Sequence, residues 1–220
     1  MEKLSKNIAA KLAADLDYDN DKKEVMAYGA FALIQMFISI VLVMIFGLIF
    51  HVAIEALIIS FTASILRKYS GGVHASSPNT CTFLGIVVCV GFALIIKLFL
   101  APLIDIKVLL IIAIPAFIWS YYMIRKLAPV DTPNKPIKRE EKRKRMKKGA
   151  LMVLELYFFI IIINMIVYLY FNLNMVIVYS VCIIFGVAWQ VLTLTKSGHQ
   201  AIEKLDLFLH IFSNINKEAK

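Results

Sequence analysis

Charged residues are scarce in this chain. They make up 18% of its 220 residues, whereas 60% of the residues are hydrophobic. Soluble proteins hold about 45–50% apolar and about 25% charged residues. The shortage excludes a soluble domain, because so few polar side chains could not cover the apolar surface. Several apolar runs of about 20 residues, the length that spans a bilayer, predict an integral membrane protein instead.

Cysteine is scarce as well, with only Cys81, Cys89 and Cys182 in the chain. An odd number of thiols without metal-ligand spacing argues against a disulfide framework and against a metal site. We therefore expect no metal and no cofactor. Cys89 and Cys182 lie within apolar runs that offer no histidine or basic neighbour, so we interpret both as structural.

The N-terminus lacks the short apolar core of a cleavable signal peptide, because residues 1–24 are polar and charged. Leucine and isoleucine recur there every four residues, which predicts an amphipathic helix that lies in the lipid headgroup region or packs on a partner helix. The tail, residues 196–220, has apolar residues at helical spacing between Ile202 and Phe212. This pattern predicts a second helix that lies on the membrane surface.

The apolar runs predict about six spans. Residues 25–66 form an apolar stretch of 42 residues. As one helix it would be about 63 Å long, roughly twice the ~30 Å hydrocarbon core, so it must fold back near Gly47–His51. The expected spans are about 27–49, 52–66, 82–100, 106–124, 151–171 and 175–195. We expect an all-α polytopic membrane helical bundle in which residues 1–220 form one domain.

Positive charge is concentrated in one loop. Residues 125–150 hold eleven Lys and Arg against three acids, a net +8 of the chain's total of +9. This is not the basic face that nucleic-acid binding requires, so we expect no nucleic-acid partner. Cytoplasmic loops carry an excess of Lys and Arg. The bias predicts a multi-pass cell membrane protein with loops 67–81 and 125–150 and both termini in the cytoplasm.

The polar segment 67–81 between two apolar runs contains the candidate chemistry. Ser77 followed by Pro78 predicts an N-cap and the first residue of a helix. Cys81 would then lie in the first turn of the third span. Backbone N–H groups and the helix dipole there favour a thiolate and can stabilise an oxyanion.

His74 precedes Cys81 by seven residues and is the candidate acid–base partner. Gly71 and Gly72 permit backbone conformations that would let His74 return to Cys81. Arg67 can attract a substrate carbonyl or carboxylate, or raise the positive potential around a thiolate. No carboxylate is near His74 in the sequence; Asp131 is the candidate for a third residue that orients His74, but the pattern favours a dyad. From spacing alone, an interfacial histidine and a packing cysteine remain the simpler alternative.

The pattern of Arg67, the Gly71-Gly72 pair, His74 and Cys81, set between membrane spans, resembles the accessory gene regulator B (AgrB) family. The polar stretch 128–137 that leads into a basic run is also similar to that family. The resemblance implies a membrane-embedded cysteine endopeptidase of quorum sensing that cuts the C-terminal part from a small AgrD-type propeptide. It implies that Cys81 is the nucleophile and His74 the general base and acid. The acyl-enzyme thioester would then close a thiolactone or lactone ring.

The family likeness also implies a propeptide partner with an acidic tail. Lys135 and the cations up to Lys148 would steer that tail toward Cys81. Setting membrane topology explains the same charges equally well. The alternative function is a small membrane transporter or peptide exporter, with a path lined by dispersed polar residues: Gln35, Glu55, Asn164 and Gln190. A non-catalytic scaffold is a third option, and a bundle this small leaves a homodimer open.

Overall fold

The computed structural model describes residues 5, 7, 10–12, 19–73, 77–131 and 139–218. The expected N-terminal amphipathic helix lies largely outside these residues. Its described members, residues 5, 7 and 10–12, are helical. His74 and Lys135 also lie outside the described residues.

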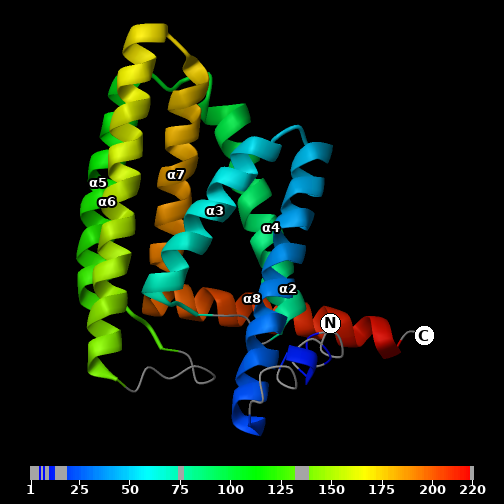
Figure 1. Cartoon of the computed structure of the whole chain (residues 1–220). Coiled ribbons are helices and arrows are strands. Elements are labelled where there is room, and N and C mark those ends of the chain that lie inside the picture. Colours follow the sequence, from blue (N-terminus) through cyan, green and yellow to red (C-terminus); the bar gives the residue numbers. More distant parts are fainter. Residues whose placement is uncertain are drawn as a thin grey trace.

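The described chain is helical from end to end, apart from its turns and loops, and the helices run up and down in a bundle (Figure 1). This confirms the predicted all-α membrane fold. In chain order the helices are α2 (Asn20–Ile49), α3 (Ala53–Ser70), α4 (Pro78–Ile95) with its π-helical continuation η1 (Ile96–Leu100), α5 (Ile106–Leu127), α6 (Glu140–Phe171), α7 (Asn174–Leu192) and α8 (Lys196–Glu218).

Five helical segments are long and apolar enough to cross a membrane: Gly29–Ile49, Pro78–Leu100, Ile106–Leu127, Glu140–Phe171 and Asn174–Leu192. Helix α3 is not among them, because it carries Glu55, Arg67 and Lys68. Its 18 residues still extend about 27 Å, close to the thickness of the hydrocarbon core. Helix α3 packs against α2, α4, α6 and α7. Its charges lie at its two ends, with Glu55 in the first turn and Arg67 and Lys68 in the last, where charged side chains are tolerated best.

The chain folds back between α2 and α3, where the sequence predicts it. His51 adopts a positive φ of 57°, and the Val52 N–H donates to the Gly47 carbonyl at 2.7 Å. His51 and Glu55 are four residues apart in the sequence, a spacing that predicts a pair between them at this end of the bundle. Instead, Lys97 from η1 lies 3.8 Å from the Glu55 carboxylate and donates to the His51 carbonyl.

The opposite end of the bundle holds most of the cations, and we call it the basic end. Helices α3, α5 and α7 end there, and α4 and α6 begin there. Part of the region expected as a basic loop is helical, because α6 begins at Glu140. A pair between Lys144 and Glu140, 3.0 Å apart and one turn from each other, supports this start. Helix α8 runs across the basic end, as expected of a surface helix (Figure 1).

Helix α7 is the most enclosed of the five spans. In the most apolar 18-residue stretch of α7, 56% is buried, whereas the buried share of the corresponding stretches in the other four spans is 11–22%. The core gathers around it, with Ile59 and Leu66 of α3 and Val181 and Val187 of α7 fully buried. The last turn of α7 therefore reaches the basic end from the middle of the bundle.

Candidate active site

Cys81 lies in the first turn of α4. Ser77 is the N-cap, and its Oγ accepts a hydrogen bond from the Thr80 N–H at 3.1 Å. Pro78 occupies the first helical position, and the Cys81 N–H donates to the Ser77 carbonyl at 3.0 Å. The helix start predicted from Ser77 and Pro78 is confirmed. The Cys81 thiol is free and half-buried, so it is both sheltered and reachable.

Helix α2 supports this start of α4. Gln35 Nε2 donates to the Pro78 carbonyl at 2.9 Å and also to Thr82 Oγ1. Ser39 Oγ lies 3.0 Å from the same Thr82 hydroxyl. Residues 77–82, which we call the cysteine flank, are thus attached to α2 next to the thiol.

The residues before the gap at 74–76 are held by other partners. We call residues 67–73 the glycine flank. The Arg67 guanidinium, at the end of α3, donates to the Val73 carbonyl and so draws the chain back over the helix end. Arg67 Nε is buried and has no hydrogen-bond partner among the described residues. The same guanidinium lies within electrostatic range of Cys81. The structure therefore brings together two of the predicted site residues.

The glycine pair forms a close-packed bend. Gly71 has φ 69° and Gly72 has φ 133°, a region that favours glycine. A Cβ on Gly71 would lie 2.2 Å from the Val130 carbonyl oxygen, and one on Gly72 would lie 2.7 Å from Thr193 Oγ1. We expected these glycines to act as a hinge. In the structure they are needed for a fixed conformation and for close approach of neighbouring chain.

The last turn of α7 anchors the glycine flank. Gln190 is fully buried, and its Nε2 donates to the Gly71 carbonyl at 2.7 Å and to Ser70 Oγ at 3.0 Å. The Val73 N–H donates to the Thr193 carbonyl at 3.3 Å. We had not singled out Thr193. The signal for Gln190 was present, because an amide in an apolar span requires a polar partner.

The segment after α5 supplies a third contact to the glycine flank. The Val130 N–H donates to the Ser70 carbonyl at 2.9 Å, and Val130 forms an isolated parallel bridge with Gly71. Arg143 of α6 lies 3.4 Å from the Asp131 carboxylate, which connects the basic start of α6 to this segment. Asp131, considered as a third residue that orients His74, is thus engaged with Arg143.

The polar residues of the alternative transporter path are all engaged with nearby groups. Besides Gln35, Glu55 and Gln190, described above, Asn164 donates to Ser180 Oγ at 3.0 Å. Each serves a separate local contact, and the four lie on four different helices. Cys89 and Cys182 are free and buried, as expected for structural thiols. In the described part of the chain, no three His, Cys, Asp or Glu residues gather as a metal site would require.

Comparison with known proteins agrees with the sequence pattern. The model of the AgrB family, accessory gene regulator B, matches residues 5–194 of this chain. The chain is 50% identical over 212 residues to "Putative AgrB-like protein" of Clostridium perfringens (strain SM101 / Type A), covering 94% of this chain and 97% of the relative. It is 49% identical over 210 residues to "Putative AgrB-like protein 2" of Clostridium perfringens (strain 13 / Type A), with the same coverage. No solved structure matches the chain significantly. A match over most of the chain, together with these identities, shows that the chain belongs to the accessory gene regulator B family.

Proposed function

We propose that this protein is a membrane-embedded cysteine endopeptidase that cleaves a small AgrD-type propeptide and releases a cyclic product. Membership of the accessory gene regulator B family supports involvement in the processing of agr quorum-sensing peptides. The cysteine chemistry is our addition. It depends above all on one observation, the placement of the free, half-buried Cys81 in the first turn of α4.

The environment of Cys81 supports a thiolate nucleophile. The N-terminal end of a helix and a nearby guanidinium both stabilise negative charge on sulfur. Arg67 fits this role because its charge is fixed and part of its guanidinium, the buried Nε, is not engaged by the described residues. We propose that Arg67 stabilises the thiolate before attack and the oxyanion that follows.

The first turn of α4 leaves one backbone donor for that oxyanion. Pro78 has no N–H, and Ser77 accepts the N–H groups of Thr80 and Cys81. The Asn79 N–H belongs to the same turn, in which backbone N–H groups have no acceptor within the helix. A donor aimed at developing negative charge contributes about 3–4 kcal/mol to catalysis in well-studied proteases. We assign this role to Asn79.

The proposed reaction proceeds through a thioester. The Cys81 thiolate attacks the scissile carbonyl, and the tetrahedral intermediate collapses as the amine of the C-terminal fragment leaves with a proton from His74. A thiol or hydroxyl within the propeptide then attacks the thioester carbonyl. His74 takes the proton of that nucleophile, and Cys81 leaves as thiolate. The thioester retains acyl activation, so ring closure requires no other energy source.

The positive charge near the site suggests how the propeptide is recognised. By the excess of cations, we place the basic end, the catalytic loop and both termini in the cytoplasm. Lys135 and the cations of α6 up to Lys148 would attract an acidic tail. Processing should then weaken as salt is raised, and charge reversal in α6 should raise KM more than it lowers kcat. If the rate of propeptide processing responds neither to salt nor to charge reversal, these cations only set the membrane topology.

The proposal is tested by co-expressing the protein with a candidate propeptide and following cleavage by mass spectrometry. Cys81→Ala should abolish cleavage, and Cys81→Ser should leave at most a trace. His74→Ala should abolish it as well. Cys89→Ala and Cys182→Ala serve as controls, since both thiols are buried away from the loop and should keep activity. Cleavage that persists in Cys81→Ala would sink the protease assignment.

A further inference from the structure

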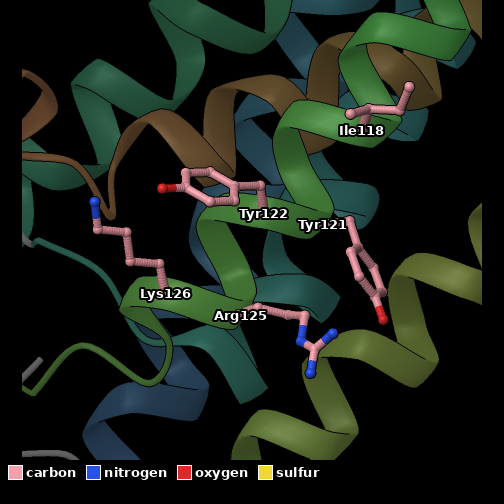
Figure 2. A pocket seen from close by; sticks show the side chains of 5 residues that line it. All are labelled: Ile118, Tyr121, Tyr122, Arg125 and Lys126. Carbon is pink, nitrogen blue, oxygen red and sulfur yellow. The ribbon is translucent and has the colours of Figure 1, made fainter.

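The last two turns of α5 carry a second feature that the peptidase proposal does not use. Ile118, Tyr121, Tyr122, Arg125 and Lys126 line a shallow hollow of about 480 Å³ on the outer face of the helix. Their spacing of three and four residues places them on one stripe. Figure 2 shows Tyr121 and Arg125 on one side of the helix, Tyr122 and Lys126 on the other, and Ile118 one turn further along.

Each cation of the hollow is held over an aromatic ring. The Arg125 guanidinium lies 5.6 Å from the centre of the Tyr121 ring, and Lys126 Nζ lies 5.6 Å from that of Tyr122. Cations at this distance from a ring face are attracted by its quadrupole, which restrains their side chains. Within the described chain neither cation forms an ion pair. Two positioned charges are therefore left for an anion.

From these cations toward the middle of α5, the same face of the helix is apolar. Ile111, Ile114 and Ile118 are 71%, 53% and 66% exposed. From Ile111 to Arg125 the helix rises about 21 Å, which corresponds to one leaflet with its headgroup region. Tyrosines prefer the boundary between the two zones. Along this face, apolar residues, tyrosines and cations follow one another in the order in which a phospholipid presents its acyl chain, its interfacial region and its phosphate.

We propose that this stripe of α5 binds an anionic phospholipid, with its phosphate between Arg125 and Lys126 and an acyl chain along the isoleucines. A zwitterionic lipid fits less well, because its ammonium group would meet the two cations. An acidic peptide segment engaged at Cys81 is a poorer candidate. Helix α5 packs on α6 and α7, whereas α4 packs mainly on α2 and α3, so the two sites lie on different sides of the bundle (Figure 1). A second copy docked face to face would oppose like charges.

Native mass spectrometry of the full-length protein tests the site, with equal amounts of phosphatidylglycerol and phosphatidylcholine added in detergent. Arg125→Gln/Lys126→Gln should lower the preference for phosphatidylglycerol by about fivefold or more. Lys142→Gln/Arg145→Gln is the matched control, since it removes one Lys and one Arg that are exposed on α6. The control should keep the preference. Equal losses in both variants, or no loss in the first, would overturn the site.

A photo-crosslinking amino acid in place of Ile118 identifies the occupant in membranes that contain phosphatidylglycerol. We expect an adduct with the mass of that lipid, and we expect Tyr121→Leu/Tyr122→Leu in the same background to reduce it. An adduct with a second copy of the chain or with the propeptide would overturn the lipid assignment, and so would the absence of a lipid adduct. Loss of protease activity in Cys81→Ala leaves this result unaffected, so the two proposals fail separately.

Discussion

The glycine flank and the cysteine flank of the site are held in different ways. The glycine flank is held by the buried side chain of Gln190 and by backbone bonds to α7 and to the segment after α5, around two glycines that admit no side chain. The cysteine flank is a regular helix start that is attached to α2 through the side chains of Gln35 and Ser39. We expect the first arrangement to be the more rigid of the two. The proposed nucleophile, Cys81, would then lie on the more adjustable part of the site, and the Arg67 guanidinium on the more rigid part.

Of the substitutions that test this difference between the two flanks, Gly71→Ala should have the largest effect on propeptide cleavage. The new Cβ would meet the Val130 backbone and the residue would keep a positive φ, at a cost of about 1–3 kcal/mol for the conformation alone. We expect propeptide cleavage to fall by at least about tenfold. Gly85→Ala is the control, because nothing lies within 4 Å of the added carbon in α4. Rates are compared in vesicles at matched protein levels. Equal activity of the two variants would show that the glycine flank is adjustable too.

Gln190→Leu and Gln35→Leu compare the two anchors directly. Loss of the Gln190 amide removes its hydrogen bonds to the part-buried Gly71 carbonyl and the buried Ser70 hydroxyl. Only the long bond from Ser70 Oγ to the Gly71 carbonyl, 3.3 Å, is then left to these two groups, and we expect a cost of about 1–3 kcal/mol. Gln35 is only half-buried, so its loss should lower the unfolding temperature in detergent by less.

The double variant Gln35→Leu/Gln190→Leu measures whether the flanks are independent. Separate anchors should give additive losses within about 0.5 kcal/mol. A clearly non-additive loss would mean that the two flanks behave as one unit. The same three variants, assayed for cleavage, report whether this coupling reaches the reaction.

Thr82→Val should have a moderate effect that is confined to the cysteine flank. The change keeps the shape of the side chain but removes the hydroxyl that Gln35 and Ser39 share. A hydrogen bond of about 1 kcal/mol corresponds to roughly fivefold in rate when it positions the nucleophile. We expect kcat to fall by about this factor while KM stays near its original value. Thr80→Val, which keeps the Ser77–Thr80 backbone bond, is the comparison; a larger loss there would shift importance from α2 to the cap.

Arg143→Gln should have the smallest effect. It removes the pair with Asp131 that joins the start of α6 to the segment after α5, but both side chains are partly exposed. Such pairs contribute about 0–1 kcal/mol. Cleavage should fall by no more than a few fold, and raised salt should produce the same change in the unsubstituted protein. Lys144→Gln breaks the Glu140 pair as a control. A loss from Arg143→Gln that far exceeds this range would give Arg143 a direct part in the reaction.

The sequence predicts the local features of this molecule well. The N-cap at Ser77, the fold-back near Gly47 and the break between the spans 151–171 and 175–195 each depend on neighbouring residues, and all three occur. Contacts between distant residues were not predictable in this way. Gln190 meets Gly71 across 119 residues, and Lys97 replaces His51 as the partner of Glu55. A polar residue in an apolar span indicates that some hydrogen-bond partner must exist. Which residue is that partner depends on which helices pack together, and the sequence pattern does not contain this information.

The length of α6 has a consequence for the peptide that the protein would cut. Its 32 residues extend about 48 Å, so an upright helix projects about 18 Å beyond the ~30 Å hydrocarbon core. The projecting turns carry the cations, while Cys81 lies where α4 begins. An extended chain covers that rise in about five residues. We therefore expect the number of propeptide residues between the scissile bond and the acidic tail to follow the number of α6 turns that project beyond the hydrocarbon core.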